Sequence, residues 1–108
     1  MARMMLLTKA ILAKLPVLYA NEEKSACDIK VPLKLFNPLG SQSWFITEYN
    51  PETGIAFGYV TGMQCDELGY ISIPEIEEMN LHRMVGIERD RYWNMNNTLE
   101  EVMDGTKK

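Results

Sequence analysis

The sequence predicts an α+β fold, in which an antiparallel β-meander of about three to five strands carries short helices packed on one face. Three observations support this prediction. Aromatic and β-branched runs occupy the middle of the chain, turn residues separate those runs, and helix-capping signals stand before and after them. The chain has 108 residues, so we expect residues 1–108 to form a single domain.

A short amphipathic helix is expected near the start of the chain. Thr8 can cap its N-terminus, and apolar residues recur at helical spacing from Ile11 to Leu15. Pro16 ends the pattern because proline cannot continue a helix. The polar residues 20–28 lack any periodicity and therefore predict a loop.

The centre of the chain predicts the strands of the meander. Alternation over residues 31–36 predicts a strand, which Pro32 restricts to an edge or to the strand's first residues, because proline offers no N–H. Residues 43–49 and 55–60 predict a β-hairpin, since asparagine, proline and glycine connect them. Residues 68–73 predict a further strand of the same meander.

Two further helices follow from capping signals. Ser72 and Glu75 have the spacing of a capping box and predict a helix that leaves directly from the preceding strand over residues 75–79. Thr98 and Glu101 repeat the signature and predict a last short helix.

The aromatic residues concentrate on the predicted strands. Because alternate residues of a strand share a face, Phe57 and Tyr59 should point the same way, whereas Trp44 and Phe45 should point apart. One set should build the core. The other could leave a tyrosine or tryptophan at the surface, where such side chains often anchor interfaces.

The charge of the chain is distributed unevenly. The net charge of −4 argues against a dedicated nucleic-acid binder, because such domains usually carry a basic excess. Between Leu35 and His82 the chain has no lysine or arginine, and its carboxylates there are Glu48, Glu52, Asp66, Glu67, Glu75, Glu77 and Glu78. A field of one sign steers a basic protein surface toward it, although a solvated face that aids solubility is the more ordinary interpretation, since acidic faces are common on soluble proteins. We therefore expect these seven residues, with Tyr49 as an aromatic anchor, to form a partner-binding surface.

The sequence offers little for metal binding or catalysis. Cys27 and Cys65 have no metal-ligand spacing, and the single His82 cannot complete a zinc site with them. We expect two reduced, partly buried thiols, no metal and no cofactor. No recognised catalytic motif is present, so the sequence favours a non-enzymatic protein and leaves catalysis open.

A second candidate site lies near the end of the chain. Glu88, Arg89 and Asp90 mix charge signs just before Tyr92 and Trp93, which is typical of a salt-bridged extended segment that anchors aromatic side chains. An Arg89 that binds a phosphate or carboxylate, together with Glu88 and Asp90, is the sharper alternative. It would make the protein a small-ligand-binding or hydrolytic domain.

Several segments together resemble a known family. They are residues 6–9, 15–16, 44–49, 57–58, 67–72 and 86–93, whose most specific parts are Glu67-Leu68-Gly69-Tyr70 and Ile87-Glu88-Arg89-Asp90. These residues resemble a bacterial family known only as domain of unknown function 2958 (DUF2958). The resemblance implies a small protein of phages, plasmids or integrative elements, often encoded near anti-restriction genes, and it brings no catalytic residue.

The leading hypothesis is accordingly an accessory protein of a mobile element that binds a host or element-encoded protein with a basic surface. It could act as an anti-defence protein that inhibits a nuclease of the anti-restriction or anti-CRISPR type. We expect no direct contact with nucleic acid, no membrane segment and a cytoplasmic location, because no signal peptide or apolar span is visible. A homodimer, formed through the proline-bearing edge strand or the aromatic face, could coexist with this role.

Overall fold

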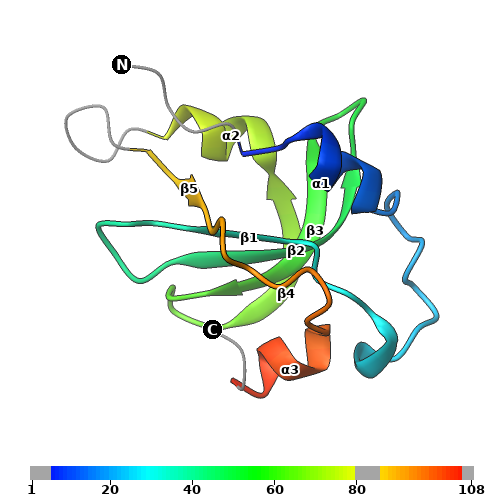
Figure 1. The fold of residues 1–108 in the computed structure, drawn as a ribbon. Helices are drawn as coiled ribbons and strands as arrows, with labels where there is room; N and C mark the ends of the chain where they lie inside the picture. Colours follow the sequence, from blue (N-terminus) through cyan, green and yellow to red (C-terminus); the bar gives the residue numbers. More distant parts are fainter. Residues whose placement is uncertain (1–5, 80–85, 106–108) are drawn as a thin grey trace.

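The computed structural model describes residues 6–79 and 86–105, and one antiparallel sheet forms its centre (Figure 1). The strands are β1 (Leu33–Phe36), β2 (Ser43–Asn50), β3 (Ile55–Thr61), β4 (Glu67–Ser72) and β5 (Glu88–Arg89). The helices are α1 (Lys9–Lys14), α2 (Ile73–Glu78), α3 (Leu99–Met103) and the 3-10 helix η1 (Ala26–Asp28). The strands lie in the order β4-β3-β2-β1-β5, so the predicted α+β class and antiparallel meander are confirmed.

The predicted hairpin between β2 and β3 is confirmed, and its turn also contacts α2. The Asn50 side chain accepts a hydrogen bond from the Glu52 N–H at 2.9 Å, which closes the turn locally. Gly54 has a φ of +77°, a conformation that disfavours a side chain, and a Cβ there would lie 2.7 Å from the ring of Pro74. The hairpin tip therefore packs against the start of α2, and the Ile73 N–H donates to the Gly54 carbonyl at 3.0 Å.

Strand β1 lies inside the sheet. It pairs with β2 on one side and with the short β5 on the other. Pro32 immediately precedes the strand, so its missing N–H interrupts no ladder, in agreement with one of the two placements predicted for it. Because β1 is not an edge, it cannot supply the dimer edge that the sequence suggested.

The sheet carries apolar side chains on both faces. Trp44 and Ile46 pack in one buried cluster with Ile11 of α1 and Ile76 of α2. Phe45 packs in a second cluster with residues of α3 and of the segment around η1. The predicted separation of Trp44 and Phe45 is confirmed.

The helices consequently lie on both faces of the sheet, with α1 and α2 above and η1 and α3 below in the view of Figure 1, rather than on one face as the sequence predicted. Alternation along β2 explains the difference, because it leaves an apolar face on each side that must be covered.

The predicted helix starts are confirmed by their caps. The Thr8 hydroxyl accepts a hydrogen bond from the Ile11 N–H, and the Ser72 hydroxyl accepts one from the Glu75 N–H. Thr98 and Glu101 form a complete capping box at α3. Helices this short depend on such caps and on buried apolar residues, because isolated helices of this length are unstable in water.

Candidate functional site

A groove of about 570 Å³ lies between the edge strand β4 and helix α2. Trp44, Val60 and Ile71 give it an apolar lining, and the exposed side chains of Glu67 and Glu75 border it. We call this concavity the acidic groove.

Two features of β4 leave the acidic groove open. The strand continues directly into α2, and Gly69 within the strand has no side chain. No atom lies within 4 Å of the position that a Cβ on Gly69 would occupy, so the surface there is open. Two methionines of the groove, Met63 and Met79, are 51% and 41% exposed. Methionine is flexible and polarizable, and it is common at surfaces that adapt to different partners.

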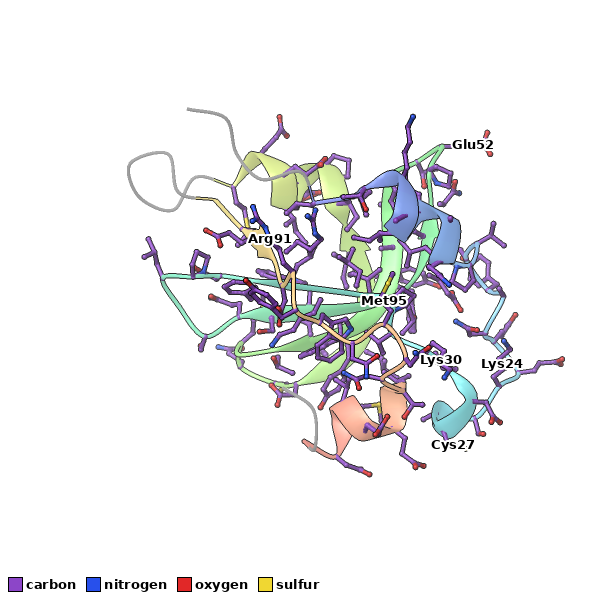
Figure 2. All side chains as sticks on the ribbon, viewed as in Figure 1. Lys24, Cys27, Lys30, Glu52, Arg91 and Met95 are labelled. Atoms are coloured by element: carbon purple, nitrogen blue, oxygen red, sulfur yellow. The ribbon has the colours of Figure 1, made fainter. Side chains whose placement is uncertain are left out.

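The carboxylates of the cation-free stretch do not all share one patch. The structure brings Glu67 and Glu75 together in the acidic groove. Glu52 lies at the tip of the β2–β3 hairpin (Figure 2). Asp66 lines a different cavity and accepts a hydrogen bond from the Gly62 N–H at 3.2 Å.

Glu48 does not belong to an exterior surface, and this corrects the prediction that it contacts a partner from outside. Its side chain is only 5% exposed. The pairing of β2 with β3 shifts between Ile46 and Glu48, and this β-bulge aligns Glu48 with Phe57. One carboxylate oxygen accepts the Tyr19 N–H at 2.8 Å, and the other accepts the Asn21 N–H at 2.9 Å.

Tyr49 is half-buried rather than an exposed anchor. It packs against the cluster of buried residues beneath α1 and α2, while Glu77 and Glu78 are exposed on α2. Burial raises the pKa of Tyr49, and the negative charge of Glu77 raises it further. Among the residues predicted to form the partner-binding surface, Glu67 and Glu75 therefore border the acidic groove together.

A second cavity, of about 390 Å³, lies over the opposite face of the sheet. We call it the aromatic pocket. Its aromatic and charged lining residues are Tyr19, Glu22, Lys24, Glu48, Phe57 and Tyr70. Sequence reasoning did not assign Tyr19 or Tyr70 to a site. Alternation along β4 could have placed Tyr70 on the face of Phe57, but no sequence signal brings Tyr19 beside it.

The three residues of the second candidate site do not face one cavity. Glu88 lies opposite Phe36 and Arg89 lies opposite Leu35, so their side chains leave opposite faces of the sheet. The acidic groove and the aromatic pocket include neither residue, nor Asp90.

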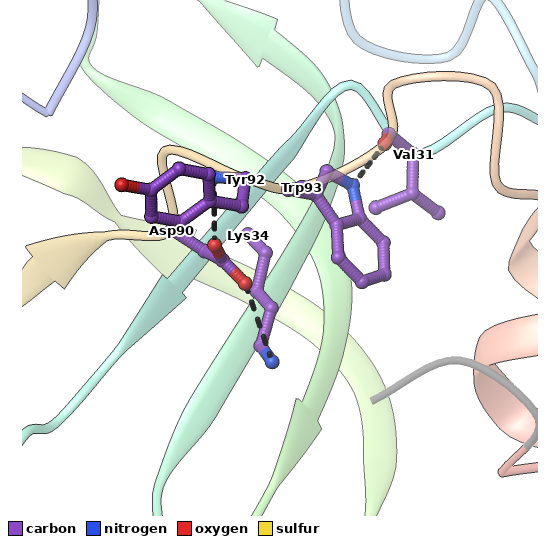
Figure 3. Close-up of polar contacts among 5 residues, drawn as sticks. All are labelled: Val31, Lys34, Asp90, Tyr92 and Trp93. Carbon is purple, nitrogen blue, oxygen red and sulfur yellow. Dashed lines mark hydrogen bonds and ion pairs between the residues drawn. The ribbon is translucent and has the colours of Figure 1, made fainter.

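Asp90 instead anchors the segment that follows β5 (Figure 3). Its carboxylate pairs with the Lys34 ammonium at 3.8 Å and accepts the Tyr92 N–H at 2.9 Å. The Lys34 ammonium also lies 5.5 Å and 5.6 Å from the ring centres of Phe45 and Trp93. The Trp93 indole N–H donates to the Val31 carbonyl at 2.7 Å. This arrangement fits the salt-bridged, aromatic-anchoring interpretation of the segment.

The cysteines differ from expectation in their burial. Cys27 and Cys65 are both free, and both are exposed rather than partly buried. Cys27 belongs to η1, on the lower right of the molecule in Figure 2. His82 lies outside the described residues.

Residues 6–79 and 86–105 contain neither a metal-binding cluster nor a membrane-spanning helix. No group of three or more histidine, cysteine, aspartate or glutamate side chains is arranged to hold a metal ion in these ranges. No helix in them has the length and apolarity needed to cross a membrane.

The fold and the groove define a small α+β protein with one antiparallel sheet and a surface concavity at its β4 edge. The chain belongs to the DUF2958 family, described as a protein of unknown function, whose model matches residues 6–108. The family resemblance read from the sequence is thereby confirmed. Searches among curated proteins and among solved structures found no match to the chain.

Proposed function

We propose that this protein acts by binding a partner protein, a basic segment of which docks in the acidic groove. The observation that carries the proposal is the juxtaposition of Glu67 and Glu75 on one concavity with an apolar lining. Carboxylates at the border select a basic partner, while the exposed Met63 and Met79 offer apolar area to the residues between its basic side chains.

The edge of β4 adds a means of holding an extended segment. Strand β4 is an outer strand of the described sheet, so alternate backbone N–H and C=O groups along it point away from β3. An extended chain can pair with such an edge through its backbone while its alternate side chains enter an adjoining groove. Open space above Gly69 supports this mode, because no side chain there obstructs the approach.

The partner class that fits this chemistry is a protein with a basic surface that normally contacts nucleic acid. The mobile-element context that the family resemblance implies makes a defence nuclease of the host the preferred candidate. Docking on its basic surface would compete with nucleic acid, so the protein would act as a non-enzymatic inhibitor in the cytoplasm.

A defined basic peptide tests the docking step. The probe is a short labelled peptide of alternating lysine and valine, and its binding is measured by fluorescence anisotropy at low and at physiological salt. We expect Glu67→Lys/Glu75→Lys to weaken binding by about tenfold and to flatten its salt dependence, because two attractive pairs become repulsive.

The matched control is Glu100→Lys/Asp104→Lys, which changes net charge equally at exposed residues of the opposite face. It should leave most of the binding intact, since neither residue lines the acidic groove. Equal weakening by both double variants would show that net charge, rather than the groove, attracts the peptide, and the proposal would fail.

A further inference from the structure

The aromatic pocket contains a buried carboxylate that pairs with no cation among the described residues. Glu48 is 5% exposed, and Lys34, the lysine of the neighbouring strand β1, pairs with Asp90 instead. Two backbone N–H groups, those of Tyr19 and Asn21, donate to its oxygens. Glu22 and Lys24 also line the pocket, and their opposite charges offset one another, so Glu48 leaves the lining with a net negative charge. Because buried charges are normally balanced by an opposite charge, the pocket is electrostatically suited to a cationic ligand.

Aromatic residues line the same pocket as this carboxylate. The ring centres of Phe57 and Tyr70 lie 5.3 Å apart in an edge-to-face arrangement. The Tyr70 hydroxyl donates to the Tyr19 hydroxyl at 3.5 Å, which joins the two phenols at the pocket mouth. Tyr19 and Tyr70 are nevertheless 59% and 61% exposed, so their rings remain accessible to a ligand.

The charge of Glu48 acts on the phenol of Tyr70. The hydrogen bond with Tyr19 raises the pKa of Tyr70 most, and the charge of Glu48 contributes to the same direction. The negative charge of Glu48 therefore acts on the Tyr70 hydroxyl at the mouth of the pocket.

The backbone at Tyr19 is held in a conformation that few residues adopt. Its φ is +72°, and in the described part of the chain no other residue except glycine has a positive φ. The hydrogen bond from its N–H to Glu48 fixes this conformation. Strained backbone that the surrounding structure stabilises is concentrated at ligand sites.

We propose that the aromatic pocket binds a small organic cation that carries an alkylated ammonium group. Glu48 would balance the charge, while Tyr19, Phe57 and Tyr70 would supply ring faces to the methyl groups. The volume of about 390 Å³ accommodates such a ligand, and the exposed Leu68 and Met103 provide apolar contacts for its carbon atoms. This site lies over the other face of the sheet from the acidic groove, although Tyr70 lines both concavities, and the proposal does not rest on the proposed docking.

Glu48 also has a structural role, because it ties the segment around Tyr19 to β2. That role alone predicts no preference between a cation and a neutral molecule of the same shape. Choline and its neutral carbon isostere, 3,3-dimethyl-1-butanol, therefore separate the two interpretations.

The experiment is a titration of the intact chain with each probe, followed by amide chemical shifts in NMR spectra. Choline should shift the amides of Tyr19, Glu48 and Phe57 and should bind at least about fivefold more tightly than the neutral isostere. Equal binding of the two probes, or shifts confined to residues outside the pocket, would overturn the proposal.

A matched pair of tyrosine variants tests the ring contribution without disturbing the core. Tyr70→Leu should weaken choline binding by about fivefold, whereas Tyr92→Leu should leave it unchanged. Both tyrosines are exposed, and Tyr92 is 96% exposed and does not line the pocket. If the two variants bind choline as tightly as the unmodified chain, the rings do not recognise the cation and the proposal fails.

An alkylated ammonium group can belong to a free metabolite or to a methylated lysine of a protein. Choline, free trimethyllysine and a short peptide with trimethyllysine distinguish these sources. Tighter binding of the peptide than of both free cations assigns the site to a protein side chain, and otherwise the site takes the free cation. Unchanged choline binding by Glu67→Lys/Glu75→Lys would show that this site stands apart from the acidic groove.

Discussion

Replacing Glu48 with alanine should destabilise the protein strongly, although the sequence alone presents this residue as one acid among many on a polar surface. The substitution removes both acceptors that hold the segment around Tyr19 and Asn21 on strand β2. Asn21 is 7% exposed, so its N–H would lose its partner where little water can replace it. Tyr19 is largely exposed, and water can replace part of its lost hydrogen bond.

The magnitude follows from these two contacts. A hydrogen bond to a charged group contributes about 1.5–3 kcal/mol, and the half-exposed contact at Tyr19 contributes less. We therefore expect Glu48→Ala to lower the free energy of unfolding by about 2–4 kcal/mol. Since domains of this size are stable by about 5–15 kcal/mol, the variant should still fold and be measurable.

The assay is urea unfolding followed by the fluorescence of Trp44 and Trp93, one in each buried cluster. The control is Glu52→Ala, which removes an exposed carboxylate at the hairpin tip and should change stability by less than about 0.5 kcal/mol. A midpoint for Glu48→Ala equal to that of the control would refute the buried anchoring role of Glu48.

Three further predictions follow from single contacts. Trp93→Phe should lower stability by about 1 kcal/mol in thermal unfolding, because it removes the donor to the Val31 carbonyl at 2.7 Å, and no change in the transition would contradict this. Gly62→Ala should cost about 1–3 kcal/mol in the same assay, because φ is +84° and a Cβ would lie 2.1 Å from a backbone oxygen; wild-type stability would be inconsistent with this turn. The pKa of Tyr49 is higher in the folded state than its unfolded value of about 10. The neutral phenol therefore contributes its full stabilisation below the unfolded pKa, and this stabilisation is lost as the pH rises through the folded pKa. Glu77→Gln should lower that pKa in an absorbance titration of tyrosinate, and an unchanged titration would remove Glu77 as a cause.

Local patterns predicted most of the elements. Capping residues Thr8, Ser72 and Thr98 mark the starts of the three α-helices, because capping depends on residues a few positions apart. Alternation and turn residues marked the β2–β3 hairpin for the same reason. The division of Trp44 and Phe45 between faces also followed from period-two alternation.

The features that the sequence did not predict depend on contacts between distant residues. The β-bulge that turns Glu48 into the aromatic pocket leaves no periodic signal, and regular alternation along β2 would place this acid on the face of Trp44 and Ile46 instead. The contact between Tyr19 and Tyr70 joins positions 51 residues apart. The packing of α3 on the second face likewise depends on tertiary contacts that no local pattern specifies.

Backbone amide shifts during titration with the alternating lysine–valine peptide test the docking proposal most directly. If the acidic groove receives the basic segment, the largest shifts will lie along β4, around Gly69, and at the start of α2, and they will vanish in Glu67→Lys/Glu75→Lys. Largest shifts on α3 or on the β2–β3 turn, or shifts that persist in that double variant, would contradict the proposed docking.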